Sequence, residues 1–257
     1  LSQQAECARD DMLPPVLVTP PWAAKKKKSP IAQLNLPPLP LEPVCMLTEE
    51  ASKQLLEQRS WYARLVDNGK EKDEKELLSC LGFHSWNRSQ NRYEDVSDAA
   101  IDAWQRQDYP ALIAEFKNTH TYRQEEWKLY MLTALPAGRA LQAWNALSQE
   151  PHTGADFVMA HLRLAGLPGF IHSFSRYPQE NLSVAIWFAA SELAPIIARA
   201  FNKLKSLREG AREWLLAYPE HAITGLLPAA LGKAGEAQDS ARLAIRMLVD
   251  NGHQPLL

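Results

Sequence analysis

Apolar residues recur at the spacing of one helix face along the last third of the chain, from Ser191 to Gly252. Between Leu193 and Leu204 they fall at i, i+3, i+4, i+7, i+8 and i+11, which places them on one stripe of an α-helix. The same pattern predicts three further helices, at 211–218, 223–231 and about 237–249. Gly252 then follows as a helix stop.

Similar joints separate these helical segments. Tyr177-Pro178 and Tyr218-Pro219 both close a helix and lie 41 residues apart, while Ala211-Arg212 and Ala241-Arg242 open helices 30 residues apart. A repeat of roughly 30 to 45 residues built from helix pairs is typical of HEAT and armadillo solenoids. The pattern therefore predicts stacked helical repeats over 136–257.

An irregular helical region is expected over 47–135. Thr48 is placed to cap a helix that runs to about Asn68, Ser97 to cap the next, and Pro110 to occupy the first turn of another. Further helices fit 121–134, 136–148, 155–165, 168–177 and 180–190. No strand is expected, because alternation of apolar and polar residues never persists over a whole segment.

The first 46 residues differ in kind, since nine of the chain's 18 prolines lie in the first 43 positions. Proline at this density forbids helices and strand ladders, so an extended arm is expected. Its aliphatic side chains, among them Leu34 and Leu39, are too many for a solvated linker, and we expect them to be buried against the helical body. A proline-rich ligand for an aromatic groove is the alternative. Lys25–Lys28 reads as a solvated loop.

Composition narrows the class of protein. The 257 residues include 46% hydrophobic residues, enough for a continuous core, and the formal net charge is −2, so no global basic field draws nucleic acid or an anionic membrane. Three scattered cysteines suit a reducing cytoplasm, and no apolar run approaches the roughly 20 residues that span a bilayer. The chain starts at Leu1 and stops soon after Gly252 without a polar capping helix, so we expect a piece of a longer protein.

The chain carries no recognised catalytic or nucleotide-binding motif, so we predict neither an enzyme nor a bound cofactor. His161 and His172 are the best pair for a metal, but a histidine bonded to the backbone is far commoner, and no metal site is predicted. Of eight tryptophans, six fall in predicted helices, where large rings fill the core. Trp22 and Trp86 lie outside clear periodicity and are the candidate anchors for a protein partner.

One local charge pattern supports a nucleic-acid alternative. Five cations gather around one helix joint: Arg199, Lys203, Lys205, Arg208 and Arg212. Helical-repeat proteins bind DNA along such basic surfaces, although a base-excising enzyme also needs a catalytic carboxylate and aromatic groups at a flipped base. No such set can be nominated here.

The stretch Leu17–Trp22, the basic run after it and Leu36–Pro40 together resemble a segment of large bacterial proteins related to the molybdate metabolism regulator of enterobacteria. Glu213–Ala222 is similar to their repeat unit. The resemblance implies an internal, repeat-bearing region of such a protein, often with a Trp-Gly-Arg domain elsewhere, and a regulatory link to molybdate. This chain has no Trp-Gly-Arg sequence.

Together these observations predict an all-α superhelix of HEAT/armadillo-like repeats with an extended proline-rich arm. The expected function is a cytoplasmic, non-enzymatic scaffold or regulatory module that binds a protein or another domain of the same chain. Nucleic-acid binding through Arg199–Arg212 is the second hypothesis, and a sensor of a metal or an oxyanion is the third.

Overall fold

The structure is a computed structural model of the 257-residue chain. It describes residues 12–14, 18, 34, 35, 37, 39, 41–58, 74–83, 85–87, 92–94, 96–119 and 126–257. The chain divides into two units, Leu1–Gln33 and Leu34–Leu257. In the first unit, Met12 and Val18 are exposed.

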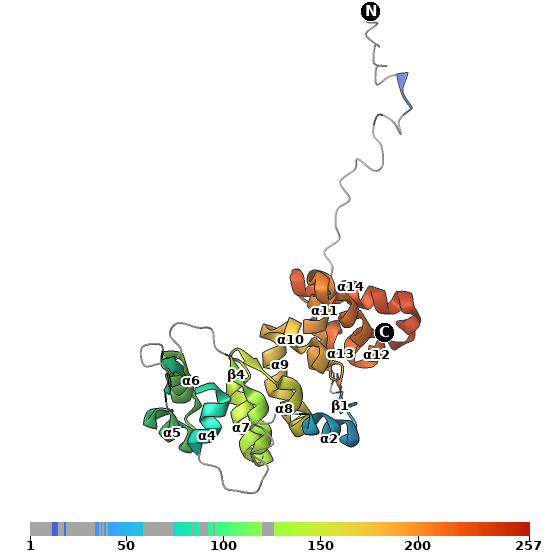
Figure 1. The fold of residues 1–257 in the computed structure, drawn as a ribbon. Helices are drawn as coiled ribbons and strands as arrows, with labels where there is room; N and C mark the ends of the chain where they lie inside the picture. The colour runs from blue at the N-terminus through green and yellow to red at the C-terminus, as the bar shows by residue number, and fades with distance from the viewer. Residues whose placement is uncertain are drawn as a thin grey trace, which may run out of the picture. The chain divides into compact units, whose positions relative to one another are not determined.

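The second unit is mostly helical where it is described, which confirms the all-α prediction (Figure 1). Its first helices begin where short polar side chains bond to backbone N–H groups. Thr48 accepts from the amide of Ala51 and starts α2, Glu49–Glu57, while Ser97 accepts from the amide of Ala100 and starts α5, Asp98–Gln105. Both predicted caps are therefore confirmed.

The described residues of this region include two more helices. Helix α4 covers Glu74–Leu78 and continues as a π turn, and α6 covers Tyr109–Thr119 with Pro110 in its first turn as predicted. The second half of the helix predicted over 48–68 lies outside the described residues.

Short strands correct the prediction that the chain has none. They form three separate pairs: β1 Val44–Cys45 with β6 Phe188–Ala189, β2 Ser85–Asn87 with β3 Arg92–Glu94, and β4 Trp127–Lys128 with β5 His152–Thr153. The first two pairs are antiparallel and the third is parallel. Pairs of two or three residues are too short to show alternation, so periodicity could not reveal them.

Two predicted helices differ from the structure because strands occupy part of their length. The helix predicted over 121–134 is, where described, strand β4 followed by a 3₁₀ turn, Leu129–Ala134. The helix predicted over 180–190 is α10, Pro178–Ala185, and the chain then becomes extended at β6. The other helices match their predicted positions closely: α7 Ala137–Leu147, α8 Ala155–Leu162 and α9 Leu167–Arg176.

The last third contains the four predicted helices: α11 Ala194–Lys203, α12 Arg208–Ala217, α13 Pro219–Leu231 and α14 Glu236–Leu248. After α14, Gly252 adopts a φ of +94°, which glycine tolerates and which suits the end of a helix.

One joint recurs after 41 residues with the same geometry. Tyr177 between α9 and α10 has φ −126° and ψ 63°, and Tyr218 between α12 and α13 has φ −127° and ψ 57°. A proline follows each tyrosine as the first residue of the next helix. The elements before the two joints also follow the same order. The first joint comes after α8, the 3₁₀ turn Arg163–Gly166 and α9, and the second comes after α11, the 3₁₀ turn Lys205–Leu207 and α12. The sequence similarity at offset 41 thus corresponds to repeated local structure.

Large aromatic side chains fill the core, as predicted. Trp104, Trp127, Trp144 and Trp214 are all fully buried, although Trp127 lies in a strand rather than a helix. Two indoles also bond to neighbouring segments: Trp144 Nε1 donates to the carbonyl of Gly166 at 2.8 Å, and Trp214 Nε1 donates to those of Ala185 and Phe188. Trp187 is half-buried and follows α10, and Trp61 lies outside the described residues.

Within the described part of the chain, no helix combines the length and the apolar character that crossing a bilayer requires.

Candidate binding groove

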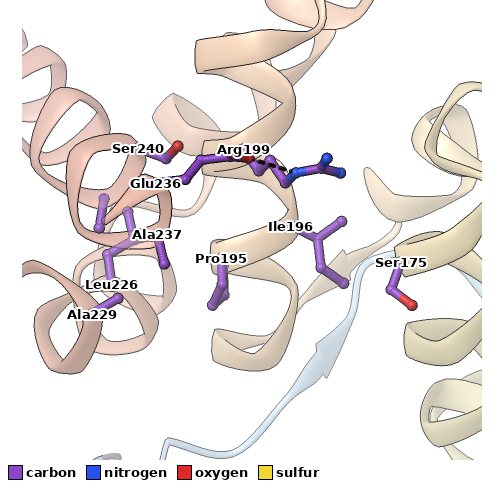
Figure 2. A pocket seen from close by; sticks show the side chains of 10 residues that line it. Ser175, Pro195, Ile196, Arg199, Leu226, Ala229, Glu236, Ala237 and Ser240 are labelled. Carbon is purple, nitrogen blue, oxygen red and sulfur yellow. Dashed lines mark hydrogen bonds and ion pairs between the residues drawn. The ribbon is translucent and has the colours of Figure 1, made fainter. Parts of the chain in front are cut away.

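A hollow of about 400 Å³ lies over the exposed side of α11, between α9 and the pair α13–α14. Figure 2 shows Pro195, Ile196 and Arg199 projecting into it from α11. Its lining is largely apolar: Ser175, Pro195, Ile196, Arg199, Leu226, Ala229, Glu236, Ala237, Ser240 and Ala241. The sequence pattern placed Ile196 in the buried stripe of its helix, but the side chain is only half-buried and faces this hollow.

Small side chains account for the empty space. Ala229 on α13 and Ala237, Ser240 and Ala241 on α14 occupy positions where longer residues would reach across the hollow. Helix α13 is nevertheless held in place by close packing at Gly225. A Cβ atom added to Gly225 would lie 2.0 Å from the carbonyl oxygen of Ser191, so only glycine permits this approach.

A second hollow of about 590 Å³ adjoins the first. Pro195 and Ala229 line both, so the two hollows are neighbours, and we call them together the groove. The outer wall of the second hollow comes from the N-terminal side of the chain, at Leu39, Leu41, Glu42 and Pro43. We call the described residues between 34 and 46 the strap.

Backbone hydrogen bonds attach the strap to the helical unit near its two ends. The amide of Leu34 donates to the carbonyl of Leu231 at 3.0 Å, and the amide of Met46 donates to that of Trp187 at 2.7 Å. His221 Nε2 bonds to the carbonyl of Glu42 at 3.1 Å. Leu34 and Leu39, predicted to be buried, are 48% and 60% exposed. Backbone hydrogen bonds therefore hold the strap near its ends, while Leu34 and Leu39 stay exposed and Leu41 is half-buried.

Charged groups mark the two ends of the groove. At one end, Arg199 Nε donates to Glu236 Oε1 at 2.9 Å, and both side chains are more than half exposed. Figure 2 shows the rest of the Arg199 guanidinium pointing away from Glu236, toward the side of Ser175. At the other end, Glu42 and Glu192 are exposed carboxylates. The middle of the groove is apolar.

Three of the five cations predicted for nucleic-acid binding are engaged with protein groups. Arg199 pairs with Glu236, Arg212 pairs with Glu209 at 3.6 Å, and the Arg208 guanidinium donates to the backbone carbonyls of Phe201 and Asn202 at the end of α11. Lys203 and Lys205 are exposed and form no ion pair with any residue that the structure describes. Lys203 and Lys205 are therefore the two of the five cations that no described protein group engages.

Neither of the two tryptophans predicted to anchor a partner is among the described residues that line the groove. Trp22 lies outside the described residues, and Trp86 lies in β2, paired with Tyr93 of β3. Their role stays a prediction. His161 and His172 lie on α8 and α9, and the described residues include no group of three or more side chains placed to hold a metal ion.

A buried polar chain that sequence reasoning missed joins β5, α9 and α10. Asn181 Nδ2 donates to Ser173 Oγ at 3.1 Å, and His152 lies 3.1 Å from the same hydroxyl and 2.7 Å from the Glu150 carbonyl. Because a carbonyl only accepts, His152 Nδ1 carries the proton, and Nε2 accepts from Ser173. Burial lowers the pKa of His152, and the Glu150 hydrogen bond and the carboxylates of Glu126 and Glu180 oppose this only in part.

This chain of hydrogen bonds resembles a nucleophile beside its base, but Ser173 is fully buried. No substrate reaches a hydroxyl in that position, so the arrangement fixes the helix joint rather than exposing a reactive group.

Comparison with known proteins gives one relative. The uncharacterized protein YehI of Escherichia coli (strain K12) is 30% identical over an alignment of 287 positions, gaps included, which covers 95% of this chain and 24% of YehI. The chain therefore spans about a quarter of the length of this relative. No family model matches the chain, and no solved structure matches it.

Proposed function

We propose that the chain is a stack of HEAT/armadillo-like repeats that serves as a non-enzymatic protein-binding module. The recurrence of the Tyr-Pro joint after 41 residues supports the repeat, because a shared backbone conformation sets the same angle between successive helices. Stacked helix pairs of this kind commonly bind partners along an extended surface.

The groove carries the proposal. A hollow with an apolar middle is costly to leave in water, and covering it with a partner recovers the free energy of burying that surface. Its few polar groups are suited to orienting a ligand rather than to chemistry: Ser240 already accepts a hydrogen bond from Asn202, and Arg199 is paired with Glu236. We therefore assign the groove to binding.

The wider context of this binding is also a proposal. The resemblance to proteins related to the molybdate metabolism regulator favours a regulatory role, within a longer cytoplasmic protein of a bacterium. A protein ligand is favoured over nucleic acid, because three of the five cations at the α11–α12 joint are held by protein groups.

Affinity capture from bacterial lysate tests the module. The bait is the full chain, compared with Ile196→Asp, which places a charge in the groove, and with Leu243→Asp, which changes an exposed leucine of α14 that does not line it. We expect a protein that is retained by the wild type and by Leu243→Asp and lost by Ile196→Asp. Equal retention by all three baits, or no retained protein, contradicts the proposal.

A further inference from the structure

The groove is electrically polarised along its length. Its outer hollow is lined by the carboxylates of Glu42 and Glu192, whereas its inner hollow is lined by Arg199 and Glu236, whose charges offset each other in an ion pair. Glu192 and Arg199 are seven residues apart on a 3₁₀ turn and the helix that follows it. At about 1.5 Å per helical residue, they lie roughly 11 Å apart along the helix axis, which an extended peptide crosses in three or four residues.

Arg199 retains donors for an incoming carboxylate despite its ion pair. Glu236 accepts from Nε, and Arg199 forms no other hydrogen bond or ion pair with the described residues. The two terminal nitrogens are therefore available, and a guanidinium fork binds a carboxylate through two parallel hydrogen bonds. Because the side chain is 57% exposed, a ligand reaches it without opening the fold.

Between the charged ends, the lining offers contacts for apolar side chains. Pro195 and Ala229 lie where the two hollows meet, and Ile196 and Leu226 face the inner one. A ligand that is charged throughout would leave this surface uncovered, and a polyanion such as nucleic acid would be repelled by Glu42 and Glu192.

We propose that the groove binds a short extended protein segment with an acidic end, an apolar middle and a basic end. The acidic end lies at Arg199 and the basic end at Glu42 and Glu192. This inference rests on the proposed binding function and adds the chemistry of the ligand.

Fluorescence polarisation with three labelled ten-residue peptides tests the polarity. All three contain two glutamates, two lysines and the same leucine- and proline-containing middle. One has the glutamates at its amino end and the lysines at its carboxyl end, the second has the reverse order, and in the third the charges alternate along the peptide. We expect one polarised order to bind the full chain about tenfold more tightly than the alternating peptide.

Two variants test whether Arg199 causes the preference for the polarised peptide. Arg199→Gln is expected to remove the preference for the polarised peptide, whereas Arg246→Gln, an exposed cation of α14 outside the groove, is expected to keep it. Unchanged melting temperatures show that both variants fold. The inference is overturned if no peptide binds at millimolar concentration, if the alternating peptide binds equally well, or if Arg199→Gln has no effect. A captured protein that is lost with Ile196→Asp but indifferent to Arg199→Gln keeps the binding function and removes only the polarity.

Discussion

Gly225 on α13 packs against the carbonyl oxygen of Ser191 so closely that a Cβ atom would lie 2.0 Å from it. This contact fixes α13 against the segment that leads into α11, and both helices line the groove. Backbone cannot move aside as a flexible side chain can, so the spacing of these helices depends on one missing methyl group.

Gly225→Ala is therefore expected to lower the free energy of unfolding by about 1–3 kcal/mol through overpacking. Gly138→Ala in α7 is the matched control, since nothing lies within 4 Å of its added Cβ. The control should be neutral or slightly stabilising, because alanine favours a helix over glycine. Urea unfolding measures both, and equal midpoints for the two variants would refute the close contact.

Replacing Trp214 by phenylalanine should leave two buried carbonyls without their shared donor. The indole Nε1 bonds to Ala185 at 3.1 Å and Phe188 at 3.0 Å, so the expected loss is about 1–3 kcal/mol in addition to the loss of ring volume. Trp104→Phe removes a similarly buried ring whose Nε1 has no hydrogen-bond partner among the described residues. Thermal unfolding should rank Trp214→Phe as the more damaging change, and the reverse ranking would contradict the bonding.

The free energy of unfolding should fall as the pH drops below about 6.5, the pKa of a histidine in the unfolded chain. Burial lowers the pKa of His152 in the folded chain, so the unfolded chain takes up a proton first and is favoured by acid. His152→Gln keeps an acceptor for Ser173 but cannot be protonated, and it should flatten this loss.

The exposed His172 supplies the control for this dependence. Denaturant unfolding between pH 7.5 and 5 should give His172→Gln the slope of the wild type. A His152→Gln variant with an unchanged slope would show that His152 is not the responsible group.

We expect only weak binding of phosphate groups at the α11–α12 joint, because only two of its five cations are not engaged by described protein groups. With Lys203 and Lys205 available, Lys203→Ala/Lys205→Ala should reduce the slope of log affinity against log salt for duplex DNA by about 1.8, or 0.9 per lost phosphate contact. Arg208→Ala/Arg212→Ala should leave the slope nearly unchanged, because Arg208 donates to the carbonyls of Phe201 and Asn202 and Arg212 pairs with Glu209. A larger reduction from the arginine pair would instead favour the nucleic-acid alternative.

Local chemistry made several features of the fold predictable from the sequence. The caps at Thr48 and Ser97 depend on a side chain and a backbone amide three residues apart, and the joint at Tyr218 depends on the proline that follows it. The strand pairs were missed because their partners are distant in the chain. Val44 pairs with Ala189, and no pattern within either segment indicates the other.

The groove was hidden for a related reason. In the sequence pattern, Ile196 belongs to the same apolar stripe as the fully buried Ile197. Only the packing of α13 and α14 decides which of the two side chains is buried. The small residues Ala237, Ser240 and Ala241 on α14 were the available signal, since a run of short side chains on one face leaves room beside it.

The assignment of the groove as the binding surface is tested most directly by hydrogen–deuterium exchange. The full chain is measured alone and in complex with the purified protein that it captures. Bound protein should slow amide exchange in 191–200 and 222–231, which contain the groove residues of α11 and α13, and leave exchange in α5 and α6 unchanged. Protection confined to α5 and α6, or no protection in either groove segment, would contradict the assignment of the groove as the binding surface.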